Sequence, residues 1–169
     1  MIHLYTGEGK GKTTAAVGLA VRAAGHDIPV LFAQFMKGND TGELHVLREL
    51  QQVRILRSEK DFGFYKQMSE TDKQELREIH DRILDEIWDA VQNKSCDILV
   101  LDEITYPVNW NLLSRDKLER ILQVADAEIV LTGRNPAPFL EEAADYITQM
   151  CCIRHPYEKG VAARCGVEY

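Results

Sequence analysis

The 169-residue sequence contains no apolar run near the roughly 18 residues that a membrane-spanning helix needs. The amino terminus enters an apolar segment directly, so we expect no signal peptide. Positive charge is scarce: 20 Lys and Arg against 27 Asp and Glu give a formal net charge of -7. This balance argues against a non-specific grip on nucleic acid or on an acidic membrane. We therefore expect a cytoplasmic protein with neither kind of partner.

Cysteine and histidine are also few, and neither shows the spacing of a metal site. No C-x-x-C pair is present, and the five histidines are scattered. We interpret the cysteines as small buried hydrophobic residues in a reducing compartment. His80 falls on an apolar helical stripe, which favours a packing role. The four cysteines are Cys96, Cys151, Cys152 and Cys165.

What is present is ordinary globular composition, with 45% hydrophobic and 28% charged residues. No repeat or low-complexity segment interrupts the chain. A chain of this size can bury a real core, so we predict a single domain over residues 1–169.

The most informative segment is IHLYTGEGKGKTTAAVGLAVRAA, from Ile2 to Ala24. It predicts a short strand, a glycine-rich turn from Thr6 to Gly11, and a helix that begins at Lys12. A strand, a glycine loop and a helix opened by Gly-Lys-Thr are typical of a phosphate-binding loop. Backbone amides and the positive end of the helix dipole would hold a polyphosphate there. The predicted nucleotide-binding residues are Thr6, Gly7, Glu8, Gly9, Lys10, Gly11, Lys12, Thr13 and Thr14.

The entry of this loop departs from the usual G-x-x-x-x-G-K-[ST] pattern, because Thr6 stands where the first glycine is expected. A β-branched residue resists positive φ, so the loop must bend differently at its entry. A merely flexible turn would explain the glycines. It would not explain the Lys-Thr-Thr that opens the helix.

A second site follows a buried strand in the segment DILVLDE, Asp97 to Glu103. Carboxylates at such a strand end hold Mg²⁺ opposite the loop threonine in P-loop proteins. We predict a metal site made by Thr13, Asp102 and Glu103, with Lys12 placing a charge on the phosphates.

Further strands and helices alternate along the chain, which predicts a parallel sheet with helices on both faces. A Thr71-x-x-Gln74 capping box opens the longest predicted helix, and Ser114 caps another. The remaining predicted strands are Pro29–Phe35, Val53–Leu56, Glu128–Thr132 and Tyr146–Ile153.

Ligands of open α/β sheets bind at the carboxyl ends of the strands, and the side chains of Lys37 and Arg134 are predicted at that edge. Lys37 lies in the loop after the second strand and faces either substrate or solvent. Arg134 follows another strand, where a guanidinium can fork onto phosphate oxygens. The segment Asp61-Phe62-Gly63-Phe64-Tyr65 is either a lid that packs on the body or a flat surface for a large apolar ligand.

Together these segments resemble the bacterial corrinoid adenosyltransferases of the CobA/BtuR type. The resemblance covers nearly the whole chain and implies a RecA-like P-loop nucleoside triphosphate-binding fold. It implies transfer of the 5′-deoxyadenosyl group of ATP to the Co(I) of cob(I)alamin or another corrinoid, with release of triphosphate. It also implies Mg²⁺, a homodimer and an electron-donating flavoprotein reductase. The segments that carry it are TGEGKGKTTAA, AQFMKG, LVLDEITY, LTGRNPAP, AADYITQM and GVAARCGVEY.

The resemblance also assigns roles to residues. Lys12, Glu103 and Arg134 would act in catalysis. Phe64, Tyr65 and Lys37 would face the corrinoid. The family commonly carries Gly-Phe-Thr-Trp in the aromatic segment, where this chain has Lys66 at the tryptophan position.

Two other functions fit a phosphate loop on an acidic strand end. One is a small-molecule kinase that transfers the terminal phosphoryl group, and the other is a non-enzymatic ATP-binding regulator. Their products separate them from an adenosyltransferase: ADP for the kinase, no turnover for the regulator, and triphosphate for the transferase.

Overall fold

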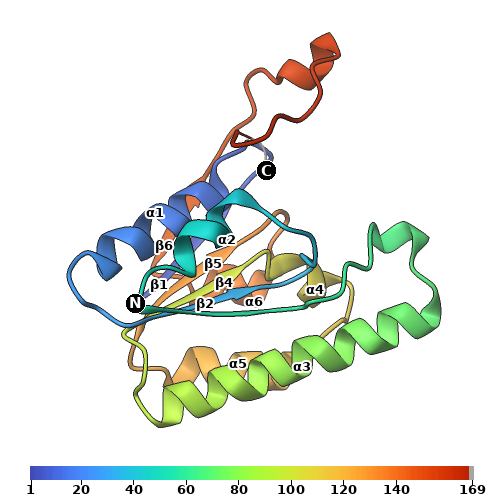
Figure 1. Cartoon of the computed structure of the whole chain (residues 1–169). Helices are drawn as coiled ribbons and strands as arrows, with labels where there is room; N and C mark the ends of the chain where they lie inside the picture. The colour runs from blue at the N-terminus through green and yellow to red at the C-terminus, as the bar shows by residue number, and fades with distance from the viewer. Residues whose placement is uncertain (168–169) are drawn as a thin grey trace.

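The computed structural model describes residues 1–167 and forms one layered α/β body (Figure 1). Strands and helices alternate from the amino terminus, as the sequence predicts. In chain order the elements are β1 Ile2–Thr6, α1 Lys12–Ala24, β2 Val30–Gln34, α2 Gly42–Leu47, β3 Val53–Arg57, the 3-10 turn η1 Tyr65–Gln67, α3 Glu70–Gln92, β4 Ile98–Asp102, α4 Thr105–Asn109, α5 Arg115–Val124, β5 Glu128–Thr132, α6 Pro138–Ala143, β6 Tyr146–Gln149 and the 3-10 turn η2 Pro156–Lys159.

The six strands form one sheet in the order β3-β2-β4-β5-β1-β6, and every pairing is parallel. The prediction of a parallel α/β sheet is therefore confirmed. This order places β4 between β2 and β5, and β5 next to β1. The carboxyl ends of β1, β2, β4 and β5 consequently meet at one edge of the sheet, although they are far apart in sequence.

Alternate residues of strands β1 to β5 supply two cores, whereas every residue of β6 is exposed. On β4, Ile98 and Val100 face the cluster that includes Ala16 and Ala20 of α1. Leu99 and Leu101 of the same strand face a larger cluster, with residues of α3, α5 and α6. Burial of apolar surface on both faces of the sheet explains why the central strands are continuous apolar runs. Figure 1 shows α1 and α2 on one side of the sheet and α3 and α5 on the other.

The long helix α3 begins two residues earlier than its predicted start. Ser69 is its N-cap: the Ser69 hydroxyl accepts from the Asp72 amide at 3.1 Å, and Asp72 Oδ2 accepts from the Ser69 amide at 3.1 Å. The capping box predicted at Thr71 and Gln74 was therefore wrong. The true box uses Asp at N3, a shorter side chain than the Glu or Gln of the usual pattern. The predicted cap of α5 is confirmed, since the Ser114 hydroxyl accepts from the Lys117 amide.

The last strand is shorter than predicted, ending at Gln149 instead of Ile153. Its only neighbour in the described sheet is β1, and the final register pair is Thr6 with Gln149. After Thr6, strand β1 turns into the glycine loop and the regular ladder ends. The Met150 amide still donates to the Thr6 carbonyl at 2.8 Å, and the Met150 carbonyl accepts from the Gly9 amide at 2.7 Å, so β6 continues into contacts with the loop itself.

The prediction of buried cysteines holds at one position only. Cys96 is buried, whereas Cys151, Cys152 and Cys165 are exposed, and all four are free thiols. The three exposed cysteines lie after β6, where the chain leaves the sheet and extends beyond the body on the side of α1 (Figure 1). His80 is fully buried, which confirms the packing role expected of it. Over residues 1–167, no helix combines the length and the apolar character needed to cross a membrane.

Candidate functional site: a phosphate loop facing an acidic strand end

The glycine loop bends where glycine permits it, at both of its ends. Thr6 stays in strand β1, and the turn is made by Gly7 at φ 99° and Gly11 at φ 110°. A Cβ at Gly7 would lie 2.5 Å from the Met150 carbonyl oxygen, so no other residue fits there. The non-glycine entry is thus accommodated by a turn that begins one residue later. Helix α1 begins directly after the loop, which points its dipole at the phosphate position.

The Lys12 side chain lies inside its own loop. Its Nζ donates to the carbonyl oxygens of Gly7 and Gly9, both at 2.7 Å, and the residue is only 7% exposed. Burial lowers the pKa of this ammonium, and nearby Arg134 lowers it further. The ammonium therefore organises the loop in this structure, beside the cavity in which a phosphate would sit.

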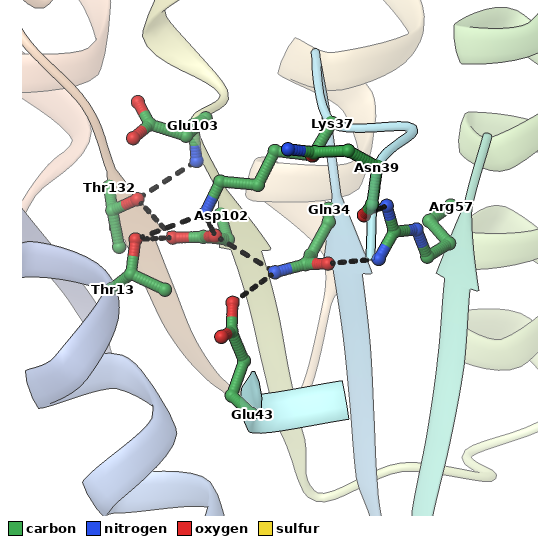
Figure 2. A network of polar contacts seen from close by, with 9 residues as sticks. All are labelled: Thr13, Gln34, Lys37, Asn39, Glu43, Arg57, Asp102, Glu103 and Thr132. Carbon is green, nitrogen blue, oxygen red and sulfur yellow. Dashed lines mark hydrogen bonds and ion pairs between the residues drawn. The ribbon is translucent and has the colours of Figure 1, made fainter. Parts of the chain in front are cut away.

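Opposite the loop, Asp102 ends strand β4 with its side chain fully buried. Oδ1 accepts from the hydroxyls of Thr13 at 2.9 Å and of Thr132 at 2.7 Å. Oδ2 accepts from Lys37 Nζ at 2.8 Å and from Gln34 Nε2 at 3.4 Å. Figure 2 shows these four side chains converging on the carboxylate from α1, β5, β2 and the loop after β2. The structure thus brings Thr13, Lys37 and Asp102 into contact.

Glu103 follows in a strained backbone conformation, with φ at 59°. Its amide donates to the Thr132 hydroxyl at 2.8 Å, which turns the side chain away from Asp102 (Figure 2). Glu103 Oε2 is buried and has no hydrogen-bond partner within residues 1–167. Burial and the charge of Asp102 both raise the pKa of this carboxyl group.

An unpartnered buried oxygen on Glu103, next in sequence to a carboxylate that accepts from a threonine hydroxyl, is a donor set that suits Mg²⁺. This ion prefers oxygen donors and usually takes one or two carboxylates together with substrate phosphates. Thr13, Asp102 and Glu103 offer that set. Residues 1–167 hold no group of three His, Cys, Asp or Glu side chains that could form an all-protein metal cage. The donor set therefore fits a metal shared with a nucleotide.

Four side chains of this network were missed by sequence reasoning: Gln34, Glu43, Arg57 and Thr132. Gln34 ends strand β2 and donates to Glu43 Oε1 at 3.2 Å, and its own Oε1 accepts from Arg57 Nη1 at 3.2 Å. A usable signal existed, since Gln34 and Arg57 are polar residues at the last positions of two strands. Such positions lie at the ligand edge of a parallel sheet.

Arg134 follows strand β5 at the carboxyl edge of the sheet and contacts the phosphate loop through Glu8. Its guanidinium donates to the Glu8 carbonyl at 3.3 Å and pairs with the Glu8 carboxylate at 3.5 Å. It borders a cavity of about 380 Å³. That volume lies in the range of small-molecule sites. The cavity is lined by Gly9, Lys10, Gly11, Lys12, Thr13, Thr14, Glu103, Tyr106, Arg134 and Val167.

A second cavity of about 780 Å³ adjoins the first, sharing Thr13, Thr14, Glu103 and Val167. It extends past Lys37 toward Glu43. The carboxy-terminal segment borders both cavities, and Lys10 Nζ donates to the Val167 carbonyl at 3.0 Å.

The aromatic segment has features of both predicted roles, a lid that packs on the body and an exposed surface for a large apolar ligand. Tyr65 packs on the body, stacked on Trp110 with ring centroids 4.2 Å apart. Trp110 in turn contacts Tyr106, which lines the first cavity. Phe64, by contrast, is 79% exposed, and Lys66 is exposed beside it. The segment is thus anchored by one ring and presents another to solvent.

Residues 1–169 match the model of the family described as ATP:corrinoid adenosyltransferase BtuR/CobO/CobP. Two similar proteins are the corrinoid adenosyltransferase of Escherichia coli K12, 33% identical, and corrinoid adenosyltransferase CobA of Salmonella typhimurium LT2, 31% identical. Each alignment covers 100% of this chain and 85% of the relative.

The similarity to one solved structure concerns the fold alone. The KaiC-like protein PH0186 of Pyrococcus horikoshii OT3 superposes with a TM-score of 0.57 at 16% identity. The superposition covers 89% of this chain and 70% of that one, in keeping with the predicted RecA-like P-loop fold. Of the segment GVAARCGVEY, the residues Glu168 and Tyr169 lie outside the described residues. On the full-length family match and these relatives, the chain belongs to the ATP:corrinoid adenosyltransferase family BtuR/CobO/CobP.

Proposed function

We propose that this protein transfers the 5′-deoxyadenosyl group of ATP to the Co(I) centre of a corrinoid and releases triphosphate. The observation that carries the proposal is the Thr13–Asp102–Glu103 edge facing the phosphate loop in a member of this family. In the reaction the cobalt electron pair forms a bond to C5′ of ATP, and the bond from C5′ to the phosphate oxygen breaks. The nucleophile belongs to the substrate, so the protein supplies position and charge.

The residues present suit that task. Loop amides and the start of α1 would hold the triphosphate, with Lys12 and Arg134 beside it. Thr13, Asp102 and Glu103 would hold Mg²⁺, which when bound stabilises the charge of the departing triphosphate. Such a cation would give a partner to the buried Oε2 of Glu103, which has none among the described residues.

We place the corrinoid on the side of the aromatic segment. Phe64 presents a ring to solvent, and Tyr65 stacks on Trp110 in a continuous path to Tyr106 and the first cavity. A flat apolar macrocycle favours such rings. Lys66, at the position of the family's tryptophan, is exposed next to Phe64 in the sequence.

The assembly and cellular setting are part of the same proposal. We expect a homodimer, a flavoprotein reductase as electron donor and a cytoplasmic location, because the family resemblance implies them. Light scattering on the purified chain measures its mass. A mass of about 19 kDa would contradict the dimer, since one chain is 19.2 kDa.

One anaerobic assay tests the reaction. Chemically reduced cobalamin, ATP and Mg²⁺ are mixed with the protein, and products are separated by ion-exchange chromatography. Adenosylcobalamin and triphosphate in equal amounts would support the proposal. ADP would indicate the kinase, and unchanged ATP across several corrinoids would indicate the regulator.

A further inference from the structure

Lys37 lies where a metal ion would be held. Its Nζ is 2.8 Å from Asp102 Oδ2 and 3.3 Å from the Thr13 hydroxyl oxygen. These two side chains belong to the proposed Mg²⁺ set. A cation between them therefore contacts the same oxygens that the metal would use (Figure 2).

The charge of Asp102 explains why a cation is needed there. The carboxylate is fully buried, and the other groups that contact it, Thr13, Thr132 and Gln34, are neutral. An unpaired buried charge is strongly destabilising. The Lys37 ammonium supplies the missing positive charge, and with its side chain 22% exposed it keeps a path to solvent.

The backbone around Lys37 is fixed on both sides. The Met36 amide donates to His80 Nε2 at 3.3 Å, and the Asn39 carbonyl accepts from Arg57 Nη2 at 2.6 Å. His80 is neutral at pH 7, since burial lowers its pKa to about 4. Its Nδ1 therefore carries the proton and donates to the Leu112 carbonyl at 2.9 Å, leaving Nε2 to accept. The ammonium can leave Asp102 by rotation of its own side chain, with no movement of the loop.

Space for that rotation exists, because Lys37 lines the cavity of about 780 Å³ together with Thr14, Glu43 and Glu103. An ammonium released from Asp102 would enter this cavity.

We propose that Lys37 is a built-in counter-ion that occupies the metal position between Thr13 and Asp102, and that an arriving metal–nucleotide displaces its ammonium into the adjoining cavity. The inference rests on the proposed function, because it requires a metal-bound nucleotide at the loop. It assigns Lys37 a first task before any contact with substrate. The negative charge of Asp102 is then neutralised at every stage: by the Lys37 ammonium before the metal arrives, and by the metal afterwards.

The experiment compares wild type with Lys37→Met, which keeps the length of the side chain and removes its charge. Thermal unfolding is measured in EDTA and in excess Mn²⁺, without nucleotide. We expect the variant to melt about 5 °C below wild type in EDTA, because Asp102 loses its counter-ion. Mn²⁺ should restore most of that loss while moving wild type by less than about 1 °C. Mn²⁺ titration followed by electron paramagnetic resonance should show binding tighter by about tenfold in the variant.

Three controls sharpen the result. Lys37→Arg keeps the charge and should behave as wild type. Lys60→Met removes an exposed lysine paired with Glu75 and should show no Mn²⁺ response. The double variant Lys37→Met with Asp102→Asn should lose the Mn²⁺ response, since both charges are gone.

Equal melting of wild type and Lys37→Met in EDTA would overturn the inference. So would Mn²⁺ binding that is no tighter in the variant, or a variant that stays unfolded with Mn²⁺ present. The adenosylation assay on wild type is scored separately. If wild type is active but the stability of Lys37→Met does not respond to Mn²⁺, only the counter-ion role of Lys37 is refuted. If wild type is inactive but Lys37→Met shows the expected stabilisation and tighter binding by Mn²⁺, only the proposed function is refuted.

Discussion

Replacing Glu103 by Gln separates the chemical role of this carboxylate from its structural role. The change keeps the size of a side chain whose Oε2 is buried without a partner in the described chain, and it removes the charge. If the carboxylate contributes to the metal site, losing it weakens stabilisation of the departing triphosphate. We expect a loss of about 3 kcal/mol in transition-state stabilisation, on the order of a hundredfold in turnover.

The effect on stability should have the opposite sign. Burial and Asp102 raise the pKa of Glu103, so the folded protein holds this proton more tightly than the unfolded chain. The group therefore favours folding most below its unfolded pKa, and that contribution is lost as pH rises through the raised folded value. At neutral pH without metal, Glu103→Gln should melt at or a few degrees above wild type, since an unpaired buried charge is gone.

Two measurements on the same preparations test this prediction. Turnover is followed anaerobically with pre-reduced cobalamin across an Mg²⁺ titration, and melting temperature is recorded in EDTA at several pH values. Wild-type turnover of Glu103→Gln at every Mg²⁺ concentration would show that the carboxylate is structural. A variant that melts well below wild type would refute the electrostatic argument.

Three further predictions concern the loop, the aromatic segment and the buried histidine. Lys12→Ala should weaken ATP binding by about 2–3 kcal/mol and cost about 1 kcal/mol of stability, because two loop carbonyls lose their donor. ATP affinity is measured by calorimetry, with Lys60→Ala as the control. Unchanged affinity in a folded Lys12→Ala variant would refute the assignment. Phe64→Ala should lower adenosylation about a hundredfold when a protein reductase has to reduce cob(II)alamin, but much less when cob(I)alamin is supplied already reduced. The reason is that the exposed ring of Phe64 is expected to help remove the axial ligand from cobalt before the metal is reduced. Equal losses in the two assays would make Phe64 an ordinary binding residue, and a gain on Lys66→Trp would show that the departure from the family pattern lowers activity. Since the pKa of His80 falls from 6.5 to about 4 on folding, its contribution to stability is complete above pH 6.5 and is lost as pH falls toward 4. Urea unfolding should show about 3 kcal/mol lost over that window in wild type and not in His80→Gln, and parallel pH profiles would contradict the assignment.

The sequence alone determined the features that depend on short-range pattern. Glycine spacing followed by Lys12 and Thr13 predicted the loop, and four apolar residues before Asp102 predicted the buried strand with its acidic end. Alternation of strands and helices predicted the parallel sheet. These predictions succeeded because backbone conformation and burial at each position follow from neighbouring residues.

The tertiary structure decided which side chains meet. Lys37 follows β2, and Asp102 ends β4; only the strand order β3-β2-β4-β5-β1-β6 makes them neighbours. The stack of Tyr65 on Trp110 joins the 3-10 turn η1 to the end of α4, two segments that share no local pattern. Even the end of β6 at Gln149 depends on where its partner β1 turns away. Such contacts lie outside the reach of sequence periodicity, because they depend on the order and register in which distant strands pair.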